Sequence, residues 1–252
     1  MMSDASAPLL QASGLTRRFG GLKAVNNVSV DLHVGEVHAV IGTNGAGKST
    51  LINMLSGEIP VSGGTITLNG ADVTSLSQPK RARSGIGRSY QRTTIFPNFT
   101  ALENCRMAAQ AARQRPWALW ESAARCEDSV GIARRALDAA GLADAAHAQA
   151  GSMSHGKKRQ LEIAMCLATA PQVLLLDEPL AGMGAEETER MLSLLENLKR
   201  AHAVLLVEHD MDAVFRVADR ITVMVNGEVI ASDVPAAIRT SADVQLAYLG
   251  DH

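Results

Sequence analysis

Short, mainly apolar runs recur along the chain, and each ends at glycine or polar residues. The runs cover residues 38–41, 173–176 and 204–207. A run of this length without alternation is typical of a parallel strand that is buried on both faces. Stretches with helical spacing lie between the runs. This order of strands and helices predicts an α/β fold with a parallel core sheet, in which ligands bind beyond the carboxyl ends of the strands.

Other segments carry the signals of antiparallel strands. Residues 28–32 alternate between apolar and polar side chains, and residues 65–68 and 221–225 each lead into an Asn-Gly pair. Asn-Gly is favoured in two-residue hairpin turns because both positions tolerate positive φ. We therefore expect an antiparallel β layer beside the parallel core.

The chain changes character between about residues 100 and 169, where it is rich in alanine and arginine and has helical periodicity. Thr100 and Glu103 form a capping-box pattern at the start of this stretch. We predict a helical subdomain at about residues 100–169, inserted in the α/β core of a single domain that spans residues 1–252.

A phosphate-binding loop is predicted at residues 42–49, which match the pattern G-x-x-x-x-G-K-[ST] directly after the first apolar strand. Glycines let backbone N–H groups converge on phosphate oxygens, and the following helix N-terminus adds positive potential. We expect Lys48 to reach the outer phosphates and Ser49 to supply an oxygen to Mg²⁺. The alternative is a glycine turn that happens to precede a lysine, and the strand and helix signals on either side argue against it. The expected nucleotide contacts in this segment are Gly42, Thr43, Asn44, Gly45, Ala46, Gly47, Lys48, Ser49 and Thr50.

Carboxylates and a histidine follow the other two apolar runs. Residues 173–176 lead directly to Asp177 and Glu178, and His209 comes just after the third run. A carboxylate at such a strand end can hold Mg²⁺, and an adjacent one can orient or deprotonate an attacking water. We therefore interpret Asp177 as a metal ligand, Glu178 as a general base and His209 as a contact to a γ-phosphate or to that water. Without the phosphate loop, an exposed strand end and a structural histidine would be the better interpretation.

Composition limits the classes of function. The chain has 24 Lys+Arg against 26 Asp+Glu and only 3% aromatic residues, which predicts no general attraction to nucleic acid. Cys105, Cys126 and Cys166 are an odd number without metal-ligand spacing, and we find no signal-peptide pattern, so a reducing cytoplasm is expected. The longest uncharged apolar stretch, residues 163–176, contains Pro171 and is shorter than the ~20 residues that span a bilayer.

These segments, taken in order, resemble the ATP-binding subunit of ABC transporters. That family carries a Leu-Ser-Gly-Gly-Gln signature at the start of a helix shortly before the strand that ends in the two carboxylates. This chain has Met153, Ser154, His155, Gly156 and Lys157 at that place, and Ser154 and Gly156 match. A hydroxyl, a small residue and free N–H groups at a helix N-terminus suit a phosphate. The resemblance implies that Ser154 and Gly156 contact ATP held by another subunit.

The resemblance also implies roles for residues outside these motifs. Phe19 resembles the aromatic residue that stacks on adenine, with a core or edge phenylalanine as the alternative. Gln91 resembles the glutamine that contacts Mg²⁺ and senses the membrane partner, with an ordinary surface glutamine as the alternative. Gly184 stands where many relatives have aspartate. The groove for the membrane subunit is expected near Gln91 and the start of the helical insertion.

Within the family, the chain is most similar to the ATP-binding subunits of the branched-chain amino acid uptake branch. Residues 19–22, 154–156, 178–183 and 247–250 carry this resemblance, which implies a family tail at about residues 228–252. It implies a head-to-tail pair of ATP-binding subunits, of one kind or two, with two Mg·ATP between them. Hydrolysis would power membrane-spanning permease subunits at the cytoplasmic face of the inner membrane, and a solute-binding protein would act indirectly. The cargo would be branched-chain amino acids or related amides, urea or organic acids.

Two other functions compete with a transport ATPase. A soluble ATPase of the same family that works on DNA or ribosomes is disfavoured by the single cassette and the absence of a basic bias. A cassette that binds ATP without hydrolysing it is disfavoured by intact Lys48, Asp177, Glu178 and His209.

Overall fold

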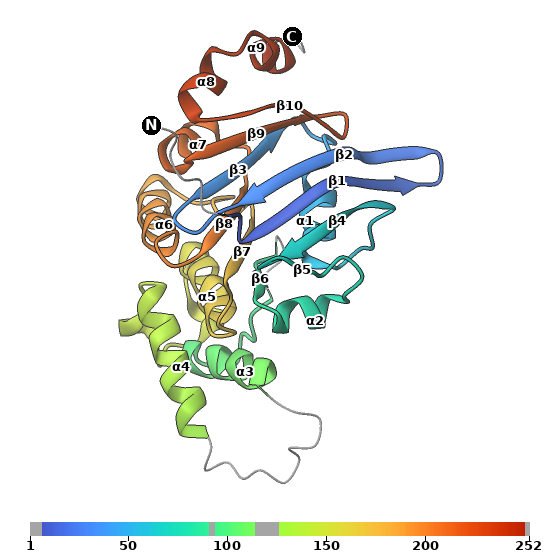
Figure 1. Cartoon of the computed structure of the whole chain (residues 1–252). Coiled ribbons are helices and arrows are strands. Elements are labelled where there is room, and N and C mark those ends of the chain that lie inside the picture. The colour runs from blue at the N-terminus through green and yellow to red at the C-terminus, as the bar shows by residue number, and fades with distance from the viewer. Residues whose placement is uncertain (1–6, 91–93, 114–125, 250–252) are drawn as a thin grey trace.

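The computed structural model describes residues 7–90, 94–113 and 126–249. The strands form a four-stranded sheet in the order β2-β1-β4-β5 and a six-stranded sheet in the order β10-β9-β3-β8-β7-β6 (Figure 1). The strands are β1 (Leu10–Phe19), β2 (Leu22–Leu32), β3 (Val37–Gly42), β4 (Gly63–Leu68), β5 (Ala71–Asp72), β6 (Ile86–Arg88), β7 (Val173–Asp177), β8 (Ala203–Val207), β9 (Arg220–Val225) and β10 (Glu228–Asp233).

The helices of the described residues surround and separate these sheets. They are α1 (Lys48–Ser56), α2 (Gln78–Arg83), α3 (Ala101–Arg113), α4 (Cys126–Ala139), α5 (His155–Leu167), α6 (Ala185–Leu198), α7 (Met211–Val217), α8 (Pro235–Thr240) and α9 (Ala242–Leu249), with short 3-10 turns η3 (Ala143–Ala145) and η4 (Ala150–Ser152). No helix in the described ranges is long and apolar enough to cross a membrane.

The predicted parallel core is confirmed, with β8 at its centre. Strands β3 and β7 each pair with β8 in parallel, and β6 and β9 extend the sheet in parallel on either side. Leu205 and Val207 of β8 pack into the apolar cluster that includes α1 and the four-stranded sheet, whereas Val204 and Leu206 pack into the cluster that includes α6. Because both faces of the strand are covered, its sequence is apolar without alternation.

The antiparallel layer is also confirmed, although it contains only one of the two predicted hairpins. Strands β1, β2, β4 and β5 pair antiparallel, and β4 turns into β5 at Asn69 and Gly70 with φ of 51° and 75°. The second Asn-Gly turn joins β9 to β10 as expected, but β9 pairs in parallel with β3 in the core sheet. Residues 221–224 of β9 are buried without interruption, which is typical of a core strand.

The helical subdomain lies next to the β6–β7 edge of the core sheet, far from α8 and α9 at the β10 edge (Figure 1). Helices α3, α4 and α5 surround a shared cluster that includes Ala101, Leu137 and Leu161. The predicted capping box forms, since the Glu103 carboxylate accepts from the Thr100 N–H at 2.8 Å and the Thr100 hydroxyl accepts from the Glu103 N–H at 3.2 Å.

A buried histidine joins the two sheets. His38 of β3 is 2% exposed, and its Nδ1 lies 3.0 Å from the Asp31 carbonyl oxygen of β2. Its Nε2 lies 2.8 Å from the Thr222 hydroxyl of β9. Burial lowers the pKa of His38 from 6.5 to about 4, so the folded protein keeps this ring neutral in mild acid.

We expect His38 to make the fold sensitive to mild acid. The unfolded chain takes up a proton at His38 near pH 6.5, whereas the folded chain does so near pH 4. The contribution of His38 to the free energy of unfolding is therefore fully present above pH 6.5. It falls by up to about 3 kcal/mol as the pH falls toward 4. Urea unfolding at a series of pH values measures this effect. Between pH 6.5 and 4, the free energy of unfolding should decrease less in His38→Gln than in the unsubstituted protein. His147→Gln, at an exposed position, is the control. An equally steep loss in His38→Gln would contradict the assignment.

Candidate active site

The phosphate loop leaves the buried strand β3 at Gly42 and enters helix α1 at Lys48. Gly47 caps α1 with φ of +99°, and a Cβ atom there would lie 2.5 Å from the Ala24 carbonyl oxygen. Only glycine fits both this conformation and this approach. Thr43, Asn44, Gly45 and Ala46 form the turn, and Ser49 and Thr50 lie in the first turn of α1. The loop therefore has the shape that its sequence predicts.

The Lys48 side chain lies back across the loop. Its Nζ donates to the Gly42 carbonyl oxygen at 2.7 Å and to the Thr43 carbonyl oxygen at 3.1 Å. Burial lowers the pKa of Lys48, while the charges of Glu178 and Asp177 oppose that shift. The amine is thus held at the loop by carbonyl oxygens and lies within the field of the two carboxylates.

Asp177 ends β7 and is 6% exposed. Its N–H donates to the Ser89 hydroxyl at 3.3 Å, and its Oδ2 accepts from the Arg88 guanidinium at 3.3 Å. Burial raises the pKa of Asp177, and Arg88 partly offsets this. The same guanidinium donates to the Glu58 carboxylate at 2.7 Å. Arg88 therefore fixes the orientation of Asp177 from the neighbouring strand β6.

Glu178 lies in the turn after β7 with φ of +49°, a left-handed conformation that costs a non-glycine residue about 1–3 kcal/mol. Its N–H donates to the Val207 carbonyl oxygen at 2.9 Å, which ties the turn to the end of β8. Glu178 Oε1 lies 3.7 Å from Nδ1 of His209, whose side chain is 63% exposed. The structure thus brings the predicted base and the predicted histidine together.

Glu208 contacts the turns that carry Glu178 and His209. No role for it is predicted from the sequence. Its side chain is fully buried, with Oε1 accepting from the Leu180 N–H at 2.8 Å and Oε2 from the His209 N–H at 3.1 Å. Burial raises the pKa of Glu208, and the two backbone N–H groups oppose that shift. The sequence does contain a signal for Glu208, because a charged residue follows directly after a fully apolar strand.

The residues of the family signature lie apart from this group, at the start of α5. Ser154 caps α5, and its hydroxyl accepts from the Lys157 N–H at 3.3 Å and donates to the Glu187 carboxylate at 2.9 Å. Gly156 N–H donates to the same carboxylate oxygen at 3.3 Å. In the described part of the chain, Ser154 and Gly156 therefore donate to a carboxylate of α6 and not to the phosphate loop.

Phe19 and Gln91 are the other two residues whose roles the family resemblance implies. Phe19 ends β1, is 48% exposed, and carries the Arg17 guanidinium 4.7 Å from its ring centroid. An exposed position excludes the core alternative for this ring. Gln91 lies outside the described residues.

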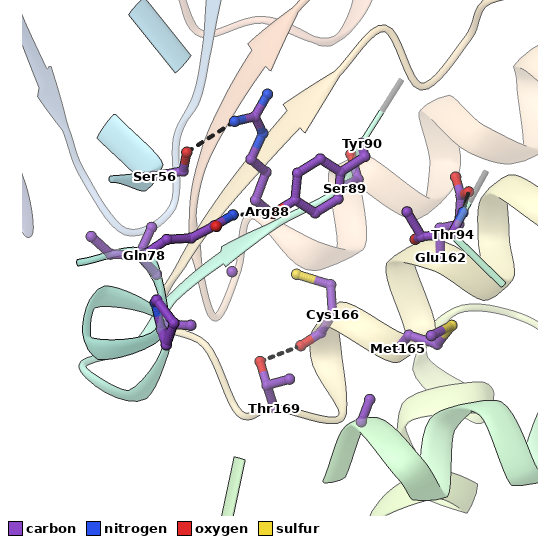
Figure 2. A pocket seen from close by; sticks show the side chains of 15 residues that line it. Ser56, Gln78, Arg88, Ser89, Tyr90, Thr94, Glu162, Met165, Cys166 and Thr169 are labelled. Carbon is purple, nitrogen blue, oxygen red and sulfur yellow. Dashed lines mark hydrogen bonds between the residues drawn. The ribbon is translucent and has the colours of Figure 1, made fainter. Parts of the chain in front are cut away.

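A pocket of about 390 Å³ opens between the α/β core and the helical subdomain (Figure 2). We call it the subdomain pocket, and its lining includes Ser56, Gln78, Arg88, Tyr90, Glu162 and Cys166. Figure 2 shows Arg88 on its core side, donating to the Ser56 hydroxyl at 2.9 Å, and Glu162 on the opposite side. The Arg88 guanidinium also lies 4.9 Å from the Tyr90 ring centroid. Arg88 therefore belongs both to the pocket wall and to the Asp177 contacts.

The site offers oxygen ligands that suit Mg²⁺. The described ranges hold no group of three or more His, Cys, Asp or Glu side chains able to bind a metal alone. Mg²⁺ typically uses one or two protein carboxylates together with substrate phosphates. The Asp177 carboxylate and the exposed Ser49 next to the phosphate loop fit that pattern.

The fold and the site together define an ATP-binding cassette. The family described as ABC transporter matches residues 25–181, and the chain belongs to it. It is 40% identical over 98% of its length to the "High-affinity branched-chain amino acid transport ATP-binding protein LivG" of Salmonella typhimurium, covering 99% of that protein. It is 39% identical to the protein with the same description, BraF, of Pseudomonas aeruginosa, with the same two coverages. The resemblance noted in the sequence is thereby confirmed.

Solved structures agree with this family. A nucleotide-free ATP-binding cassette from an ABC transporter superposes with a TM-score of 0.85 at 28% identity, covering 96% of this chain and 98% of that one. The ADP conformation of the cassette MJ1267 also gives a TM-score of 0.85, at 27% identity, covering 97% of this chain and all of that one. The P-loop cassette fold predicted from the sequence is therefore correct.

Glu208→Ala should destabilise the protein strongly. The substitution removes the acceptor of the buried Leu180 N–H and of the partly buried His209 N–H, and a buried N–H without an acceptor costs about 1–3 kcal/mol. We expect the free energy of unfolding in urea to fall by roughly 2–5 kcal/mol. Glu186→Ala is the control, because its carboxylate is 85% exposed and contacts only a surface arginine, Arg190. A loss for Glu208→Ala no larger than for the control would show that the two buried contacts contribute little.

Proposed function

We propose that this chain binds Mg·ATP at the carboxyl edge of the core sheet and hydrolyses it to power a membrane importer. The observation that carries this proposal is the meeting of three strand ends. The loop after β3 presents Lys48, the turn after β7 presents Glu178, and the turn after β8 presents His209 within 3.7 Å of Glu178. Membership of the ABC transporter family supports the same activity.

ATP binding would use the loop and the helix that follows it. N–H groups of residues 42–50 and the N-terminus of α1 suit the phosphates, and Lys48 would exchange its two carbonyl contacts for phosphate oxygens. Phe19 would stack on the adenine. Ser49, Asp177 and Gln91 would hold Mg²⁺, which neutralises charge on the β- and γ-phosphates.

Hydrolysis would depend on Glu178 and His209. Glu178 orients a water molecule and accepts its proton as the oxygen attacks the γ-phosphorus. The bond from that phosphorus to the bridging oxygen of ADP breaks, which gives ADP and inorganic phosphate. His209 contacts the γ-phosphate end, and Glu208 holds the backbone of both turns in place. Positioning and charge stabilisation account for most of the catalysis in this chemistry.

A second ATP-binding subunit would complete each site. In a head-to-tail pair, Ser154 and Gly156 of one subunit would donate to the γ-phosphate bound at the loop of the other. The start of α5 suits this role because it combines a hydroxyl, an N–H group and the positive end of a helix. The pair consists of two copies of this chain or of this chain and a related one.

The membrane partners would be permease subunits, which dock at the subdomain pocket. The pocket joins the core to the helical subdomain at residues 100–169 and includes Arg88, which contacts Asp177. The cassette then works at the cytoplasmic face of the membrane as one domain over residues 1–252, with a family tail at 228–252. The names of LivG and BraF support branched-chain amino acids as the cargo, with related amides, urea or organic acids as the wider class. A solute-binding protein would act through the permease.

Glu178→Gln should separate binding from turnover. Loss of the base should lower kcat by at least about 100-fold, while ATP affinity stays similar and an ATP-bound dimer accumulates. Phosphate release, a fluorescent ATP analogue and light scattering after size exclusion measure the three quantities. Glu196→Gln on the outer face of α6 is the control. Undiminished hydrolysis by Glu178→Gln would place the base elsewhere.

Phe19→Ala should weaken ATP binding without changing the fold. Loss of one aromatic stacking contact costs about 1–3 kcal/mol, which is roughly a 5- to 150-fold rise in Kd. Calorimetric titration with ATP measures the affinity, and circular dichroism checks the fold. Leu246→Ala is the control: it removes an exposed apolar side chain from α9, and it should leave the affinity for ATP unchanged. If Phe19→Ala and the unsubstituted protein bind ATP with equal affinity, Phe19 does not stack on adenine and its role is structural.

A further inference from the structure

The N-terminus of α5 already holds an anion that belongs to the same chain. Glu187 lies in the first turn of α6, and its Oε1 accepts from the Ser154 hydroxyl at 2.9 Å and from the Gly156 N–H at 3.3 Å. The hydrogen bond from Ser154 lowers the pKa of Glu187, so the carboxylate is ionised at neutral pH. A negative charge is favoured at this position because the helix N-terminus is positive.

The carboxylate lies directly against the start of α5. A Cβ atom at Gly156 would lie 2.6 Å from Cδ of Glu187, so a larger residue there would require the end of the Glu187 side chain to shift. The hydroxyl proton of Ser154 and the N–H of Gly156 are both directed to one oxygen of Glu187. The donors that the proposed function assigns to the partner's γ-phosphate are therefore occupied in the single subunit.

These donors cannot serve two anions together. Ser154 has one hydroxyl proton and Gly156 has one N–H, and a carboxylate beside a phosphate adds repulsion between like charges. We propose that Glu187 competes with the partner-bound nucleotide for the start of α5, and that it must leave Ser154 and Gly156 when two subunits close on ATP. This inference rests on the proposed function, in which Ser154 and Gly156 complete the site of a second subunit.

A cationic side chain near Glu187 can pair with the displaced carboxylate. Arg190 lies one turn further along α6 and lines the same small recess as Gly156, Lys157 and Glu187. Arg190 pairs with Glu186 at 2.7 Å in the single subunit. Because side chains three residues apart on a helix are neighbours, Arg190 can also pair with Glu187 after Glu187 leaves Ser154. Glu187 then acts as a positioning residue that holds Ser154 in the separate subunit and raises the ATP concentration at which closure occurs.

The test compares two glutamates of α6 in the full chain. Both Glu187→Gln and Glu196→Gln are made in the Glu178→Gln background, where hydrolysis does not remove the dimer. The ATP concentration at half-maximal dimer formation is measured by light scattering. Glutamine keeps the size of the side chain but removes its charge, so Glu187→Gln should dimerise at an ATP concentration at least about fivefold lower. Glu196→Gln should match the background, because Glu196 is 45% exposed and pairs with Lys199, away from α5 and Arg190.

The opposite results have distinct meanings. If Glu187 only supports the orientation of Ser154, Glu187→Gln will need more ATP than Glu196→Gln, or as much, and the competition is refuted. Melting temperatures of the variants check that they fold.

Ser154→Ala tests the proposed function separately: if it dimerises at the same ATP concentration as the background, the assignment of α5 to the partner's nucleotide is wrong. If the background forms no ATP-dependent dimer with Mg·ATP, the pairing fails and the Glu187 proposal fails with it. ATP binding by the single subunit, measured by calorimetry, tests the phosphate loop apart from both.

Discussion

The parallel pairing of β3 and β7 with the central strand β8 is the constraint on which the site depends. Val40 of β3 and Asp177 of β7 are both paired with Val207 of β8. Because parallel strands run in the same direction, the segments that follow them emerge at one edge of the sheet. Groups separated by more than a hundred residues of sequence therefore share one small region, and the burial of these strands on both faces fixes that register.

Hydrogen bonds to a buried carboxylate connect the turns at this edge of the sheet. A carboxylate without partners is costly in an apolar interior, so Glu208 is stable there only with the backbone N–H groups of Leu180 and His209. These bonds connect the turn after β7 to the turn after β8, and the Glu178 N–H adds a third bond to the Val207 carbonyl oxygen. The left-handed conformation of Glu178 is thus held by contacts on both sides. The position of the proposed base is set by the backbone as well as by its own side chain.

Features with local signals could be predicted from the sequence, and those that depend on distant contacts could not. The apolar strands, the phosphate loop and the Thr100–Glu103 capping box are each encoded within a few residues, and all three are present. The β9–β10 hairpin was predicted by its turn, but no local signal told that β9 joins the core sheet beside β3. Arg88 contacts Asp177 across 89 positions of sequence, and Glu187 contacts Ser154 across 33, so neither role was visible in the sequence.

The division of the site between two surfaces follows from these contacts. The phosphate loop, Asp177, Glu178 and His209 form one group at the sheet edge, whereas Ser154 and Gly156 bond to the α6 carboxylate of their own chain. In the proposed function a single subunit would therefore bind the phosphates of a nucleotide without using α5, because Lys48 contacts the loop and not that helix. On the other side of the site, Arg88 lines the subdomain pocket and also holds Asp177, so a partner that moves Arg88 changes the orientation of the proposed Mg²⁺ ligand. In the proposed function, nucleotide binding would use the phosphate loop, pairing of subunits would use the start of α5, and docking of the membrane partner would reach Asp177 through Arg88.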